Sequence, residues 1–220
     1  MSVIDPRPIR FRRIALALLP VSLALLSACA TPLQPPVVGY TCCNLRPVDG
    51  WISSNNVQGG GMIPAGQKVR LDSMKRSYYV YGTIGGQDFA LRDDSAHSNA
   101  DTMAWIRRLV VAQDPNAQTT AWGPEIRAAV RYGRVLVGMT RAQVAMSLGY
   151  PSPNDTPDLT APKWRYWTAA EDLPIDLVFD GDQRLVRLEG KPSAIAIVEA
   201  EHLVDTRQSS VAPGVSSAND

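Results

Sequence analysis

The stretch VGMTRAQVAMSLGYP, which ends at Pro151, carries a start signal and a stop signal for one short helix. The Thr140 side chain can accept a hydrogen bond from the amide of Gln143, and the Gln143 side chain can reach back to the Thr140 amide, which is the pattern of a capping box. Gly149 can adopt a positive φ after the last turn, and Pro151 prevents the helix from continuing. A short helix with both ends fixed is therefore predicted, and the chain must change direction on either side of it.

The segments around this helix predict a unit of two helices followed by three strands. An earlier helix begins at Pro124, since proline is favoured in the first turn of a helix. Alternating apolar residues predict strands in KWRYWT (163–168), IDLVFD (175–180) and RLVRLEG (184–190). Three antiparallel strands offer one apolar face, which two helices can cover.

Residues 45–95 have the character of a small β-module. Val69 and Leu71 alternate with polar neighbours, as expected for a half-buried strand. Many turn residues separate short strand candidates, which indicates a strongly bent sheet similar to a Src-homology-3 domain. A helical connector over residues 96–121 follows. The predicted fold class is therefore α+β, with a Src-homology-3-like β-module followed by an ααβββ domain.

The first 28 residues have the pattern of a bacterial secretory signal. Four arginines precede an apolar run, IALALLPVSLALL, which is shorter than the ~20 residues needed to span a bilayer. The sequence LSAC then ends at Cys29 and resembles the lipobox of bacterial lipoproteins, in which the cysteine sulfur receives a diacylglycerol and becomes the new N-terminus. The alternative is an ordinary signal peptide with a coincidental cysteine.

Lipidation of Cys29 would attach the chain to a membrane. Ala30 follows this cysteine, and the resemblance to known lipoproteins then favours the outer membrane, with the protein facing the periplasm. Residues 29–44 are predicted to form an extended tether, because residues 30–41 contain three prolines and no charged side chain. Residues 191–220 are predicted to form a disordered tail. SAIAIVEAEHLV (193–204) could form a loose helix, but RQSSVAPGVSSAND (207–220) is small and polar and shows no periodicity.

The charge of the chain disfavours nucleic acid as a partner. Residues 1–28 hold four arginines and one aspartate out of 22 basic and 21 acidic residues, so the mature chain has 18 basic and 20 acidic side chains. Binding to phosphates needs clustered positive charge, which such a chain lacks.

Two adjacent cysteines, Cys42 and Cys43, remain after lipidation of Cys29 and are the candidates for a disulfide. The periplasm is oxidising, and three states are open to them: a strained ring with each other, a bond to another chain, or burial in reduced form. Two adjacent thiols cannot complete a tetrahedral metal site, and His97 and His202 stand at no recognisable ligand spacing. No metal or cofactor is therefore predicted.

Three motifs, VGMTRAQVAMSLGYP, WRYW and LVFDGDQRLVRLE, together resemble the SmpA/OmlA family, the BamE-like lipoprotein domain. Family members with a known role are outer-membrane lipoproteins that help stabilise the β-barrel assembly machinery on its periplasmic side, and they have no active site. The resemblance implies two helices on a three-stranded antiparallel sheet over residues 122–190, and envelope proteins as partners. This chain departs from the family in the long segment before that domain, so a related lipoprotein with a different partner is an equal alternative.

The sequence WRYW contains the candidate partner surface. Neighbouring residues of a strand face opposite sides, so Trp164 and Tyr166 share one face while Arg165 and Trp167 share the other. Exposed aromatic and arginine side chains are typical of protein interfaces. The hypothesis is that Arg165 and Trp167 form part of a partner surface, and the alternative is that the β-module covers them.

No catalytic motif is present in the sequence, which lacks a GxSxG elbow, an HExxH helix and a phosphate-binding glycine loop. Cys42 and Cys43 lack the histidine-activated setting of a cysteine hydrolase. A non-catalytic protein-binding or scaffold function is therefore predicted. The alternative is a peptidoglycan-binding module built on residues 45–95, and an envelope hydrolase is a remote third hypothesis.

Overall fold

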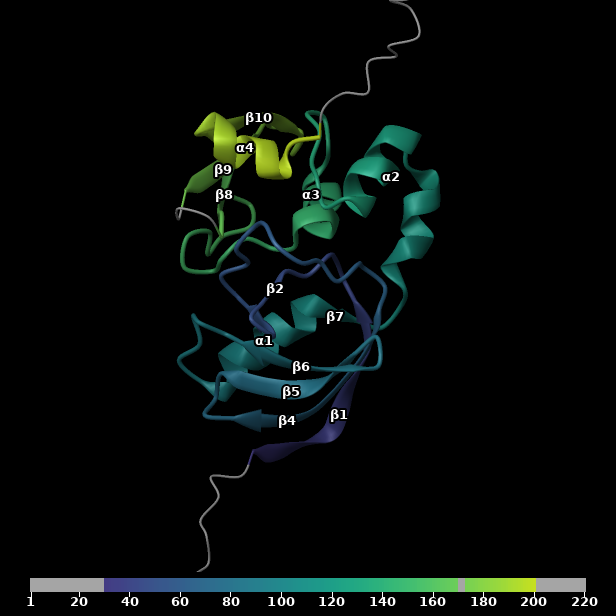
Figure 1. Cartoon of the computed structure of the whole chain (residues 1–220), viewed down its shortest axis with the longest axis vertical. Helices are drawn as coiled ribbons and strands as arrows, with labels where there is room; N and C mark the ends of the chain where they lie inside the picture. Colours follow the sequence, from purple (N-terminus) through teal and green to yellow (C-terminus); the bar gives the residue numbers. More distant parts are fainter. Residues whose placement is uncertain (1–29, 170–172, 201–220) are drawn as a thin grey trace, which may run out of the picture.

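The computed structural model describes residues 30–169 and 173–200, and it confirms the α+β class. Two sheets each pack into a hydrophobic core of their own. Figure 1 shows the larger sheet at one end of the long axis and the smaller sheet at the other. Cys29, the signal pattern before it and residues 201–220 of the predicted tail lie outside the described residues.

The larger sheet is mixed and strongly curled, with its seven strands in the order β2-β3-β6-β5-β4-β1-β7. Neighbouring strands are antiparallel except β3 and β6, which are parallel. The strands are β1 (Thr31–Thr41), β2 (Pro47–Val48), β3 (Trp51–Ser53), β4 (Lys68–Lys75), β5 (Tyr79–Ile84), β6 (Gln87–Arg92) and β7 (Val110–Val111).

The predicted connector, residues 96–121, contains two helices. The first, α1 (Asn99–Leu109), lies against the sheet formed by β4, β5 and β6 (Figure 1), and Ile106 packs with Val80 and Leu91 in the core of the larger sheet. This helix therefore belongs to the first unit. The 3-10 helix η1 (Pro115–Ala121) then leads to the second unit.

The prediction of a tether over residues 29–44 is wrong, because residues 31–41 form strand β1. Val37 of this strand pairs with Leu71 of β4, and Tyr40 pairs with Val111 of β7. The three prolines lie in the first half of β1, and Pro35 and Pro36 fall in the irregular stretch between Pro32 and Val37 where the pairing with β4 shifts register, a position at which a strand tolerates proline. At Gly39 a Cβ atom would collide with the carbonyl oxygen of Val111, so glycine permits the close approach of β7.

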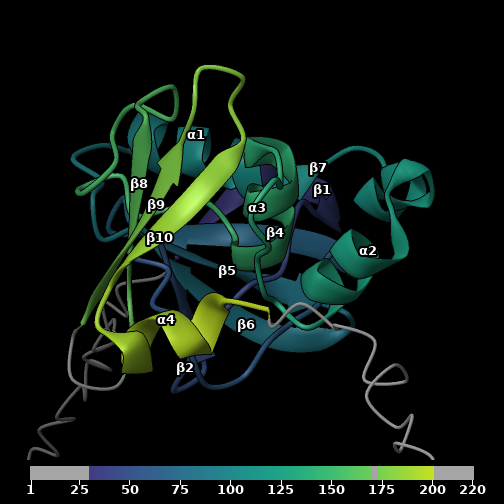
Figure 2. The same cartoon turned by 90° about the horizontal axis from the view of Figure 1, so that it is seen from above.

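The second unit has the predicted order of helix, helix and three strands. Its elements are α2 (Pro124–Arg131), α3 (Arg141–Leu148), β8 (Lys163–Trp167), β9 (Pro174–Phe179) and β10 (Leu185–Gly190). The three strands form an antiparallel sheet in the order β10-β9-β8. Seen from above, α3 lies between this sheet and α2 (Figure 2), and all of them contribute to one core.

Helix α3 is the predicted short helix with two fixed ends. The Gln143 amide donates to Thr140 Oγ1 over 3.3 Å, and the Thr140 amide donates to Gln143 Oε1 over 2.9 Å, so the capping box is confirmed. Gly149 has the predicted positive φ of 80°, but its ψ of 174° makes it extended rather than left-handed helical. Every residue from 143 to 148 is buried, so α3 forms the centre of the second unit.

The prediction that disorder begins at residue 191 is also wrong. Residues 192–198 form helix α4 (Pro192–Val198), in which Ala194 and Val198 are fully buried. The Val135 amide donates to the Val198 carbonyl over 2.7 Å, and the Ala200 amide donates to the Val135 carbonyl over 2.8 Å. These hydrogen bonds connect the end of α4 to a segment some sixty residues earlier in the sequence. A helix as short as α4 depends on such tertiary contacts for its stability.

The two units are joined through amide side chains, the first of which is the buried Asn44. Its Nδ2 donates to the carbonyl of Val130 at the end of α2 over 2.7 Å and to that of Ser147 at the end of α3 over 2.9 Å. Its Oδ1 accepts from the Ala65 amide over 2.9 Å. Since the last carbonyls of a helix have no partner within the helix, Asn44 completes the ends of two helices from outside their own unit.

Asn56 and Gln58 extend this junction. Asn56 Nδ2 donates to the carbonyls of Leu148 and Tyr150 over 2.8 and 2.7 Å. Gln58 is fully buried, and its side-chain Nε2 donates to the Leu148 carbonyl over 3.1 Å. The backbone N–H of Gln58 donates to the Trp167 carbonyl over 2.6 Å. We call Asn44, Asn56 and Gln58 the amide clamp, because together they fix one unit onto the other.

Among the described residues, no helix has the length and apolar character needed to cross a membrane.

We predict that Asn44→Ala lowers the free energy of unfolding by roughly 3 kcal/mol, because it leaves the Ser147 carbonyl and the Ala65 amide without partners and removes one of the donors to the Val130 carbonyl. Urea unfolding followed by circular dichroism measures this loss. Asn154→Ala is the control: residue 154 is exposed, and its substitution should change the free energy by less than about 0.5 kcal/mol. Equal losses in the two variants would show that the amide clamp does not join the units.

Candidate functional site

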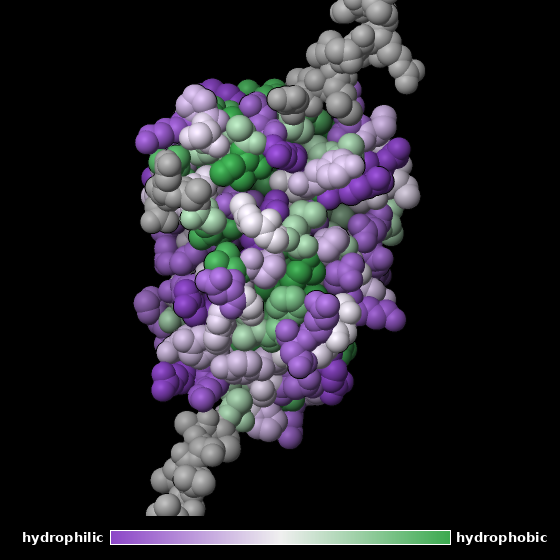
Figure 3. Space-filling model, in the orientation of Figure 1, coloured by the Kyte–Doolittle hydropathy of each residue, from purple (hydrophilic) through white to green (hydrophobic). Residues whose placement is uncertain are grey.

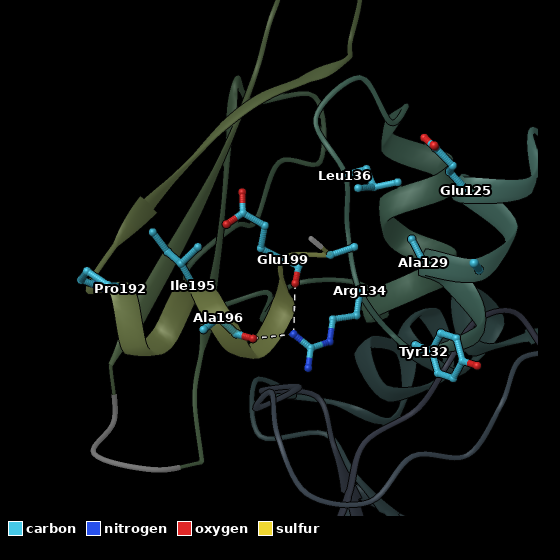
Figure 4. Close-up of a pocket in the computed structure, with 11 residues that line it drawn as sticks. Glu125, Ala129, Tyr132, Arg134, Leu136, Pro192, Ile195, Ala196 and Glu199 are labelled. Atoms are coloured by element: carbon cyan, nitrogen blue, oxygen red, sulfur yellow. Dashed lines mark hydrogen bonds between the residues drawn. The ribbon is translucent and has the colours of Figure 1, made fainter. Parts of the chain in front are cut away.

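An open groove of about 790 Å³ lies between α2 and α4. Alanine side chains line both walls of the groove, among them Ala129 of α2 and Ala196 of α4 (Figure 4). Larger side chains at these positions would close the space, so the groove exists because small residues stand where two helices come near each other. Leu136, which lies between the helices in sequence, contributes a buried apolar surface.

Arg134 holds the two walls at a fixed separation. Its Nη1 donates to the carbonyls of Ala196 and Glu199 at the C-terminal end of α4, over 2.5 and 3.0 Å (Figure 4). Its own amide donates to the Ala129 carbonyl of α2 over 2.8 Å. A positive charge at the C-terminal end of a helix is favourable, so one residue both caps α4 and ties it to α2.

The rim of the groove combines an aromatic side chain with two carboxylates. Tyr132 is 69% exposed, which is unusual for a large hydrophobic residue in this protein. Glu125 of α2 and Glu199 at the end of α4 are both exposed. The space-filling view shows hydrophobic residues gathered over α4, with hydrophilic residues around them (Figure 3). An apolar groove with acidic edges is suited to an apolar segment that carries a basic residue.

The residues predicted as a partner surface lie elsewhere, on the outer face of the smaller sheet. Trp164 and Tyr166 are buried, 2% and 0% exposed, while Arg165 and Trp167 are partly exposed, so the predicted alternation is confirmed. Trp167 Nε1 donates to the carboxylate of Asp155 over 3.0 Å. The role of Arg165 and Trp167 in binding stays a prediction.

Arg165 belongs to a network of charges around Asp176 of β9. Its Nε and Nη2 donate to the two carboxylate oxygens of Asp176, each over 2.7 Å, and Lys163 Nζ donates to the same carboxylate over 3.2 Å. The hydrogen bonds from Arg165 hold the pKa of Asp176 below its usual value, against the opposing effect of burial. The charge of Arg165 is thus satisfied within the sheet, which makes this face less available to a partner than the groove.

The cysteine pair has a structural position at the end of β1. Cys42 and Cys43 form a disulfide with each other, so the structure selects the ring among the three predicted states. Cys43 is 1% exposed in the core of the larger sheet, and the Cys42 amide donates to the Leu109 carbonyl over 2.8 Å. Within residues 30–169 and 173–200, no three residues of the metal-binding types are grouped closely enough to hold an ion.

Comparison of the chain with models of protein families, with curated proteins and with solved structures gives no match. The assignment of a site therefore rests on its geometry. Sequence reasoning missed the groove, because residues 191–220 were assigned to a tail and one wall of the groove is α4. The apolar residues Ile195 and Val198, which share a face at helical spacing, are the signal that could have indicated α4.

We predict that Trp164→Ala lowers the free energy of unfolding by about 3–5 kcal/mol, as expected for the loss of a buried aromatic side chain. Trp167→Ala should cost clearly less, about 1 kcal/mol, because its ring is partly exposed. Chemical unfolding of both variants tests the difference. A cost of several kcal/mol for Trp167→Ala would exclude this residue as a partner surface.

We predict that Asp176→Asn lowers stability by about 2 kcal/mol at pH 7. The folded-state pKa of Asp176 lies below the unfolded-state value of about 3.9, so its stabilising effect is complete above that value and is lost as pH falls through the folded-state pKa. The difference between wild type and variant should therefore shrink below about pH 4. Unfolding curves at several pH values measure it, with Asp182→Asn in an exposed turn as the control. A difference that stays constant down to pH 3 would contradict the assignment.

Proposed function

We propose that this chain is a non-catalytic outer-membrane lipoprotein, anchored through Cys29 on the periplasmic side, which binds an envelope protein in the groove between α2 and α4. The groove is the observation that carries the proposal. Its alanine-rich walls, its exposed Tyr132 and its acidic edges are the features of a surface for a protein segment. The signal pattern with its lipobox supports the location.

The order of elements supports a scaffold function of the BamE-like kind. We propose that residues 122–190 are a BamE-like domain, since α2, α3, β8, β9 and β10 follow the order that the resemblance implies. We propose further that the curled larger sheet is a Src-homology-3-like module. Helix α4 lies beyond the resemblance and forms one wall of the groove, so the partner need not be the one that typical family members bind.

The chemistry of the groove limits what can occupy it. Its floor offers apolar contacts from Ala129 and Leu136, and its edges offer the carboxylates of Glu125 and Glu199. The guanidinium of Arg134 donates hydrogen bonds to carbonyls at the end of α4 and keeps its positive charge, but the two carboxylates at the edges outnumber it. The occupant is therefore an apolar segment of an envelope protein, with a basic side chain near it. Subunits of the β-barrel assembly machinery are the partners that the resemblance implies.

We predict that Ala196→Arg reduces recovery of the partner by at least about tenfold, because a long charged side chain fills the groove. Residue 196 is exposed, so the variant should fold normally. The measurement is affinity purification of the lipidated protein from solubilised, mildly crosslinked envelopes, with quantitation of the co-purified envelope proteins. Ala142→Arg, at an exposed position of α3 that does not line the groove, is the matched control. Equal recovery with both variants, or no envelope protein with the wild type, would contradict the proposed function.

A further inference from the structure

A second surface, far from the groove in sequence, consists of four neighbouring aromatic residues of the first unit. The ring centroid of Tyr79 lies 5.1 Å from that of Trp51, 4.4 Å from that of Tyr78 and 6.4 Å from that of Tyr81. We call these four residues the aromatic cluster. Each of them is partly exposed, and neither the core nor the groove accounts for them.

The cluster lies on the outer face of the larger sheet. Tyr79 and Tyr81 of β5 point away from the core, because Val80 between them is fully buried on the opposite face. Helix α1 covers that opposite face. The side chains of the cluster carry four polar groups, the indole N–H of Trp51 and the three tyrosine hydroxyls. In the described part of the chain, none of these four groups has a hydrogen-bond partner. Such rings, with an apolar body and a free polar tip, suit a boundary between an apolar and an aqueous phase.

The strand register places this cluster beside the start of β1. Thr31 pairs with Met74 of β4, and Met74 pairs with Val80 of β5. Two strand spacings of about 4.8 Å put the backbone of β5, which carries Tyr79 and Tyr81, roughly 10 Å from β1, and Trp51 of β3 lies two strands further from it. Cys29 precedes Thr31 by two residues, which span at most about 7 Å. A lipid on Cys29 therefore brings the aromatic cluster within reach of the membrane surface.

The charges next to the cluster favour an anionic surface. Lys75 ends β4, and Arg76 follows it in the exposed turn that leads to Tyr78. Within the described ranges neither of these two side chains has an ion-pair partner. Arg92, by contrast, is neutralised by Asp94 at 2.5 Å. Basic residues next to an anionic bilayer are attracted by its negative surface potential.

We infer that the aromatic cluster, with Lys75 and Arg76, is a membrane-contact patch that seats the first unit on the phospholipid surface. Tryptophan and tyrosine side chains are enriched at the headgroup level of membranes, and interfacial binding depends on apolar contact together with basic residues. The inference rests on the proposed lipidation of Cys29. A glycan is the other ligand that aromatic rings and hydroxyl groups fit, but the nearness of the cluster to the anchor site and its free basic residues favour lipid.

The test uses the mature chain, residues 29–220, with Cys29→Ser so that no lipid anchor contributes. Sedimentation with vesicles of phosphatidylethanolamine and phosphatidylglycerol should show binding. A double variant, Tyr78→Ser with Arg76→Glu, should weaken it roughly tenfold, because it removes one ring and reverses one charge. Tyr132→Ser, at the groove, is the matched control and should leave vesicle binding unchanged. No binding by the unlipidated wild type, or an equal loss in the control, would overturn the inference.

A second measurement does not depend on how the aromatic variants fold. Vesicles with brominated acyl chains should quench tryptophan emission, and Trp51→Phe should remove most of that quenching while binding persists. Quenching that is unchanged in this variant would place Trp51 away from the lipid. Purified peptidoglycan is tested in parallel, and retention on it in place of vesicles would overturn the inference in favour of a glycan.

These outcomes are separate from those of the proposed function. Ala196→Arg should reduce partner recovery without changing vesicle binding, and the double variant should weaken vesicle binding without changing partner recovery. Loss of both activities in either variant would show that one surface serves both ligands and would contradict the membrane-contact patch.

Discussion

The rest of the structure depends on three amide side chains, two of them buried and one partly buried, that complete helices in another unit. Asn44, Asn56 and Gln58 come from the first unit, yet they donate to carbonyls at the ends of α2 and α3. Buried polar groups without partners are costly, and here each unit supplies the partners that the other lacks. Ala65 of the first unit even packs in the core of the second. Removal of residues 45–95 would therefore damage the second unit as well, so only point substitutions can separate the functions of the two.

The groove is a consequence of this junction. Asn44 fixes the end of α2, and Arg134 then connects α2 to the end of α4. With both helices held from outside, their alanine faces stay apart without large side chains between them. The surface around Arg165 and Asp176 differs from the groove, because these two charged side chains already bind each other within the smaller sheet. A surface whose own groups are satisfied is a poorer candidate for binding than one that leaves apolar area uncovered.

The sequence predicted what local signals determine, and it failed where distant residues decide. Helix α3 was predictable because Thr140, Gln143 and Gly149 lie within a single helix and its ends. Strand β1 was not, since its prolines and lack of charge are typical of a linker, and its pairing with β4 and β7 is set by residues far along the chain. Helix α4 and one wall of the groove were missed for the same reason. The amide clamp was not predictable either, because the sequence does not indicate to which carbonyls an asparagine or glutamine side chain will donate.

Strand β1 has a further consequence when Cys29 carries lipid. A flexible linker would let the protein sample many heights above the bilayer, but here the folded body begins almost at the anchor. Figure 1 shows the start of β1 at one end of the long axis and α2 and α4 at the other. The body itself then acts as a rigid spacer between bilayer and partner. With the proposed anchor at Cys29, the length of the body sets the distance from the bilayer at which a partner segment is bound, and this distance stays constant.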